Sequence, residues 1–176
     1  MSRSKSIIAI AAASVLLLAG CSSSNDSFAG ITPTCDAFKG GAEIDQVKVT
    51  GADGKVPTVE FPTKGDGTSQ LSLIKTSQTK VVKEGSGPTF TGNQLVTIEY
   101  VIVNSANGEV LASSKFDGTD AASQVFDSTT TKVFCDALTG VKEGSLVVFA
   151  NPKSEADPNG TTYVLQLKKV YLPHAN

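Results

Sequence analysis

The sequence predicts an α+β domain in which an antiparallel, twisted β-sheet packs on one short α-helix. Apolar and polar residues alternate along several short runs, and the most extended of them is 95–103 (LVTIEYVIV). Such alternation is typical of strands with one buried face. Asn107-Gly108 follows and is the strongest hairpin signal in the chain. Only the segment around 131–138 has the apolar spacing of a helix.

Further short runs on either side of residues 95–103 complete the predicted sheet. Glycine-containing turns such as 51–54 (GADG) and 84–87 (EGSG) separate several of them. Many strands with one short helix favour antiparallel pairing. The other predicted strands are 47–49, 59–61, 71–73, 79–82, 109–112, 146–150 and 162–171.

The predicted helix begins at Thr131, whose hydroxyl can cap it, and Gly140 ends it. Its length of about two turns is too short for a stable isolated helix, so we expect it to pack against the sheet. Its apolar stripe consists of Val133, Phe134, Ala137 and Leu138.

The N-terminus has the pattern of an export signal. Two basic residues precede an apolar run of about a dozen residues, 7–18, which is shorter than the roughly 20 residues that span a membrane. Residues 18–21 (Leu-Ala-Gly-Cys) resemble the lipobox of bacterial lipoproteins. The sequence therefore predicts a signal peptide at 1–20 and a lipid on Cys21 that anchors the chain to the extracytoplasmic face of the cell membrane. An ordinary secretory signal with an incidental cysteine is the alternative.

After the signal peptide we expect three parts. Residues 21–34 are mostly small and polar and are predicted to form a flexible tether. A β-rich lead-in follows at 35–78, and the main domain occupies 79–173. The net charge is only -2 and no basic run is present, so we expect no nucleic-acid partner. We expect a monomer.

The two remaining cysteines, Cys35 and Cys135, would lie in an oxidising compartment, where a pair usually forms a disulfide. Two free buried thiols are the alternative. A catalytic cysteine is not favoured, because the only histidine, His174, lies in the terminal tail.

Several motifs follow one another in the second half of the chain. They are 82–87 (VKEGSG), 91–100 (TGNQLVTIEY), 107–109 (NGE), 138–144 (LTGVKEG) and 163–167 (YVLQL). In this order and at this spacing they resemble the FKBP-type (macrolide-binding) peptidyl-prolyl isomerases over roughly 79–172, which implies an FKBP-like fold. The preceding residues 47–62 are similar to the lead-in of actinobacterial FKBP-type lipoproteins.

The resemblance implies a proline pocket between the helix and the sheet. Rotation about an Xaa-Pro bond meets a barrier of about 20 kcal/mol. An apolar pocket that favours the twisted amide lowers this barrier, so we expect no metal and no cofactor. The implied partners are exported or unfolded polypeptides with Xaa-Pro bonds. By the family pattern, the pocket residues are Tyr100, Leu111, Phe126, Phe134 and Leu165.

The chain also departs from the family pattern. Leu111 and Ala112 replace a Phe-Asp pair whose aspartate orients the pocket. Residues 116–117 and 126–127 are both Phe-Asp, but they lie too far from Gly108 to restore that pair.

The loop 151–161 lacks the Tyr-Gly segment that covers the pocket in active members. Two hypotheses therefore stand side by side. The chain is either a prolyl isomerase that assists the folding of exported proteins, or a catalytically inactive FKBP-like binding module. A lipoprotein whose fold is only a scaffold is a third alternative.

Overall fold

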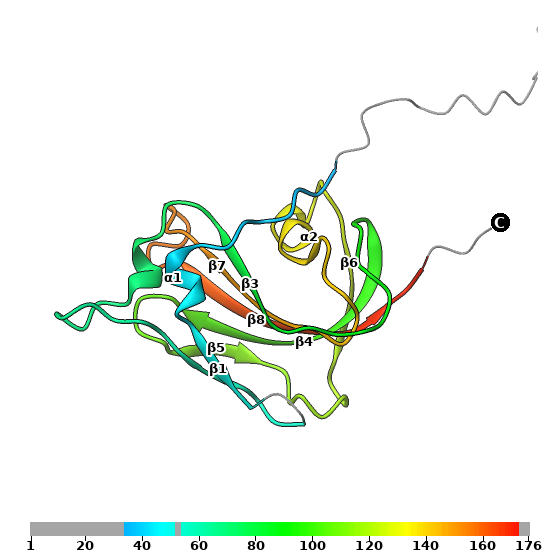
Figure 1. Cartoon of the computed structure of the whole chain (residues 1–176), viewed down its shortest axis with the longest axis horizontal. Helices are drawn as coiled ribbons and strands as arrows, with labels where there is room; N and C mark the ends of the chain where they lie inside the picture. The colour runs from blue at the N-terminus through cyan, green and yellow to red at the C-terminus, as the bar shows by residue number, and fades with distance from the viewer. Residues whose placement is uncertain (1–33, 52–53, 173–176) are drawn as a thin grey trace, which may run out of the picture. The chain divides into compact units, whose positions relative to one another are not determined.

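The computed structural model describes residues 34–51 and 54–172 (Figure 1). All of them belong to one compact unit, Pro33–Asn176. The predicted signal peptide and Cys21 lie outside the described residues, so lipid attachment stays a prediction. Within the described part of the chain, no helix is long and apolar enough to cross a membrane.

A six-stranded sheet forms the centre of the unit (Figure 1). Every pairing in it is antiparallel, as the sequence predicts. The strand order is β3-β7-β8-β4-β5, and β6 pairs with the first half of β4 while β5 pairs with the second. The strands are β3 (Gln78–Lys83), β4 (Gln94–Asn104), β5 (Val110–Ser113), β6 (Ala122–Phe126), β7 (Leu146–Asn151) and β8 (Thr161–Val170).

Both faces of the sheet carry a buried core, because successive side chains of a strand point to opposite faces. On one face, Val96 and Ile98 of β4 pack with Leu138 of helix α2 (Lys132–Leu138). On the other face, Val101 packs in a second cluster that includes Leu71 of the lead-in. Figure 1 shows α2 above the sheet and β1 below it. The apolar run that marks β4 in the sequence therefore serves two cores.

The lead-in holds two short helices and one small hairpin. The hairpin pairs β1 (Lys48–Thr50) with β2 (Thr58–Glu60). Residues Ala42–Asp45 form α1, and Gln70–Leu73 form the 3-10 helix η1. The strand predicted at 71–73 is wrong: this segment turns so that Leu71 is fully buried while Leu73 is 41% exposed.

Side chains of β3 hold the lead-in on the sheet. The Lys80 ammonium donates to the Asp45 carbonyl at 2.6 Å and to the Val47 carbonyl at 3.2 Å. The Gln78 side chain accepts from the Ile44 N–H at 3.2 Å and donates to Glu43 at 2.9 Å. These contacts fix α1 where Ile44 is fully buried in the second cluster.

Two leucines of η1 give a matched test of the second core. Leu71→Ala should lower the free energy of unfolding by about 2–5 kcal/mol, because it leaves a cavity in a packed interior. Leu73→Ala, two residues away and partly exposed, should lower it by less than about 1 kcal/mol. Urea unfolding of both variants measures the difference. Equal effects would mean that the lead-in does not pack on the sheet.

Candidate functional site

A cavity of about 320 Å³ lies between the N-terminal part of α2 and the sheet. Four elements and the turn before α2 supply its walls. None of the lining side chains carries a charge. They are Ile98, Tyr100 and Ile102 from β4, Ala122, Gln124 and Phe126 from β6, Tyr163 and Leu165 from β8, and Thr131 and Phe134 at the start of the helix.

The two-residue period of the strands explains why these side chains meet. Every second residue of a strand points to the same face, so positions 98, 100 and 102 of β4 all face α2. Tyr100 pairs with Leu165 of β8, which places their side chains next to each other on that face. The turn after β6 brings Phe134 over the same surface.

Phe134 is the centre of an aromatic cluster that forms the cavity floor. Its ring stacks on Phe126 with centroids 5.1 Å apart. It meets Phe149 and Tyr163 edge-on, at 5.5 Å and 5.2 Å. Phe149 and Tyr163 stack on each other at 4.6 Å. Such stacked and edge-on pairs add roughly 0.5–1.5 kcal/mol each to the burial of the rings, so they stabilise the floor.

The structure brings together four of the five residues that the family pattern assigns to the pocket. Tyr100, Phe126, Phe134 and Leu165 all line the cavity. Leu111 does not: it lies on β5, 55% exposed, where the pairing of β4 with β5 shifts register. The extra residue at this irregularity moves the side chain away from the position that simple counting along the strand predicts.

Sequence reasoning missed Tyr163. The signal that could have identified it is its place two residues before Leu165 on the same strand, and therefore on the same face. Burial raises the pKa of the Tyr163 hydroxyl, and the Asp157 carboxylate raises it further. The hydroxyl is therefore protonated at neutral pH and can donate a hydrogen bond at the cavity wall.

Neither of the two Phe-Asp pairs supplies a carboxylate to the cavity. Phe116 is buried in the second core, on the other face of the sheet. Hydrogen bonds hold the pKa of the Asp127 carboxyl well below its usual value. The largest effect comes from the Thr129 hydroxyl, and Thr130 adds to it. Asp127 therefore orders the turn that leads into α2 but does not line the cavity.

Thr131 stands at the N-cap of α2, as predicted, but makes no capping hydrogen bond with its side chain. Its hydroxyl instead accepts from the Asp127 N–H at 2.7 Å. Gly140 follows the helix with a φ of 85°, in the left-handed region that favours glycine.

The loop between β7 and β8 contributes no side chain to the cavity lining, although its Asp157 carboxylate lies near enough to Tyr163 to raise the pKa of that hydroxyl. Pro152 and Lys153 line a groove with residues 72–75 of the lead-in. No residue of 152–160, all of which the structure describes, lines the cavity. The loop between β7 and β8 therefore does not cover the cavity.

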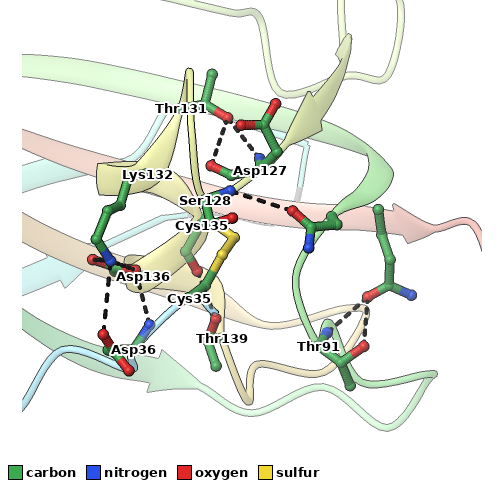
Figure 2. The surroundings of a disulfide bond; sticks show 12 residues. Cys35, Asp36, Thr91, Asp127, Ser128, Thr131, Lys132, Cys135, Asp136 and Thr139 are labelled. Atoms are coloured by element: carbon green, nitrogen blue, oxygen red, sulfur yellow. Dashed lines mark hydrogen bonds and ion pairs between the residues drawn. A yellow bond between two sulfur atoms is a disulfide. The ribbon is translucent and has the colours of Figure 1, made fainter. Parts of the chain in front are cut away.

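A disulfide between Cys35 and Cys135 ties the start of the lead-in to α2, as the sequence predicts (Figure 2). Next to it, the Asp36 N–H donates to the Asp136 carboxylate at 2.9 Å. Lys132, one turn earlier on α2, donates to the same carboxylate at 2.9 Å, and this contact raises the pKa of the Lys132 ammonium. The helix that carries Phe134 is thus joined to the start of the lead-in by a disulfide and a hydrogen bond at neighbouring residues.

One group of carboxylates in the described part of the chain is close enough to share a cation. The nearest oxygens of Glu99, Asp117 and Asp120 lie within 4.8 Å of one another. Glu99 is fully buried, and its carboxylate accepts from the Gly118 N–H at 2.7 Å and pairs with the Lys168 ammonium at 3.2 Å. The ion pair with Lys168 compensates the buried charge, while the Oε2 oxygen that faces Lys168 has no hydrogen-bond partner among the described residues.

No protein-family model and no curated protein matches the chain. Among solved structures, it is similar to a peptidyl-prolyl cis-trans isomerase from Pseudomonas syringae pv. tomato strain DC3000, with 19% identity over 55% of this chain and 76% of that chain and a TM-score of 0.44. It is also similar to the N-terminal domain of FKBP42 from Arabidopsis thaliana, with 12% identity over 68% of this chain and all of that chain (100%) and a TM-score of 0.45.

Replacing both cysteines by alanine should lower the free energy of unfolding by up to about 4–5 kcal/mol, because the bond closes a loop with a sequence separation of 100. Denaturant unfolding of the variant and of the oxidised and reduced wild type measures the loss. Alkylation under denaturing conditions is the control: both thiols should react only after reduction. Alkylation of Cys35 or Cys135 without reductant would contradict the disulfide.

Proposed function

We propose that the cavity binds proline-containing segments of other polypeptides and accelerates the cis-trans isomerisation of their Xaa-Pro bonds. The single observation that supports this most is the uncharged cavity of about 320 Å³ floored by the cluster around Phe134. Tyr100, Phe126 and Leu165, which the resemblance to FKBP-type motifs assigns to a proline pocket, line its walls.

The physical basis is differential binding of the twisted amide. During rotation about the Xaa-Pro bond the amide loses its conjugation, and with it part of its polarity. A dry apolar surface therefore suits the twisted form better than the planar form, which water solvates well. No proton transfer is required, so the absence of charged side chains from the lining fits this reaction.

A second candidate is a binding module without useful catalysis. It is favoured by the exposed position of Leu111, by Ala112 in place of the family's aspartate, and by the absence of residues 152–160 from the cavity lining. In this case the cavity would hold a proline segment without lowering the rotation barrier.

The proposal places this domain outside the cytoplasmic membrane, held by a lipid on Cys21. The pattern at residues 18–21 and the disulfide, which is typical of oxidising compartments, support this location. The clients would then be newly exported chains.

The direct test follows cis-trans exchange of an Ala-Leu-Pro-Phe peptide by NMR with and without the protein. We expect acceleration by the wild type, and a fall of at least about tenfold (~1.4 kcal/mol in barrier) in Tyr100→Ala and Phe134→Ala. Leu111→Ala is the matched control and should keep full activity, because Leu111 lies outside the cavity. Circular dichroism checks that each variant is folded. If Phe134→Ala fails to fold, the activity of Tyr100→Ala alone tests whether the cavity carries the reaction.

Three outcomes separate the candidates. Bound peptide without accelerated exchange would favour the binding module. No binding and no acceleration would contradict both. Full activity in both cavity variants would place the reaction elsewhere on the protein.

A further inference from the structure

A row of exposed apolar side chains crosses β4, β6 and the residue that follows β8, at one end of the sheet. Leu95 of β4 is the register partner of Val125 of β6, and the Tyr171 N–H donates to the Leu95 carbonyl at 3.0 Å. These three side chains are 39% to 45% exposed. We call these three residues the apolar row.

The apolar row faces away from the cavity. Val96, next to Leu95, points into the core beneath α2, and neighbouring residues of a strand point to opposite faces. Gln124 and Phe126, which flank Val125, line the cavity for the same reason. Cross-strand neighbours share a face, so Tyr171 lies on the side of Leu95.

Polar groups border the apolar row. The Thr97 hydroxyl bonds with that of Ser123 at 3.0 Å and lies 3.5 Å from the Tyr171 hydroxyl. Lys169, paired with Thr97 in the sheet, is exposed and pairs with Glu143 at 3.8 Å. The exposed surface therefore combines apolar side chains with hydroxyl and ammonium groups beside them. Such a combination suits the boundary between the lipid tails and the head groups of a bilayer.

The apolar row also lies at the end of the sheet where the predicted tether is attached. A Cβ on Gly92 would lie 3.3 Å from the Cys35 sulfur, and Leu95 is three residues further, at most about 11 Å along the chain. Cys35 is fourteen residues after Cys21. A flexible chain of that length has a root-mean-square span of only about 20 Å.

We propose that the apolar row rests on the surface of the lipid bilayer to which Cys21 anchors the chain. This inference rests on the predicted lipid at Cys21 and is independent of isomerase activity. With the apolar row on the bilayer, the cavity on the opposite face of the sheet is open to chains that emerge from the membrane.

A second copy of the chain fits the surface less well. A stable protein interface buries about 800 Å² on each partner, and three partly exposed side chains supply much less. A bilayer needs no such area, because the lipid on Cys21 already supplies most of the attachment.

The test uses the absence of tryptophan from the chain. In the full-length lipidated protein, Tyr171→Trp places the single tryptophan in the apolar row, and Val110→Trp places it on exposed β5 as the matched control. Excitation at 295 nm keeps the tyrosines out of the signal. Both proteins are reconstituted into vesicles of phosphatidylcholine and phosphatidylglycerol with or without brominated acyl chains. Bromine quenches only a fluorophore at the bilayer, so we expect at least about twofold quenching for Tyr171→Trp and none for Val110→Trp.

A second pair of changes checks the apolar row itself. Adding Leu95→Asp and Val125→Asp to Tyr171→Trp should abolish the quenching while leaving peptide binding and exchange at the wild-type level. Equal quenching at the two tryptophan positions, or quenching that survives both aspartates, would overturn the proposal. Intact mass showing no lipid on Cys21, or a dimer in sedimentation that the aspartates dissociate, would overturn it as well.

Discussion

The packing of Phe134 between the sheet and Phe126 is the contact on which the cavity depends. Helix α2 has only seven residues, and an isolated helix of that length does not persist in water. Its stability comes from tertiary contacts: the edge-on contacts of Phe134 with Phe149 and Tyr163, and the disulfide at Cys135. The cavity is the space beside this attachment, so the same aromatic cluster that holds the helix also forms the binding surface.

The second core supports the cavity from the other face of the sheet. Tyr100 and Val101 are neighbours on β4, and while Tyr100 lines the cavity, Val101 is fully buried against the lead-in cluster. A strand packed on both faces has little freedom to move. The disulfide adds a direct link, because it joins the first described residues of the lead-in to the helix above the cavity. The lead-in therefore acts as part of the scaffold of the site.

The sequence predicts the parts of this architecture that follow from periodicity. The resemblance to the FKBP pattern assigns Tyr100 and Leu165 to the pocket, and both line the cavity, where the two-residue period of their strands turns them to the same face. Leu111 lies elsewhere, since the irregular pairing of β5 cannot be foreseen from spacing. The strand expected at 71–73 is a 3-10 helix, because burial of Leu71 against the sheet prevails over the weak local pattern.

The central claim is that the cavity binds proline-containing peptides. The chain has only three tyrosines, of which Tyr100 and Tyr163 line the cavity and Tyr171 lies on the opposite face of the sheet. Protein with isotope-labelled tyrosine rings is titrated with an Ala-Leu-Pro-Phe peptide, and the three ring signals are followed by NMR. The account predicts that the signals of Tyr100 and Tyr163 shift together while that of Tyr171 stays in place. A titration that leaves all three unchanged, or that moves only Tyr171, would contradict it.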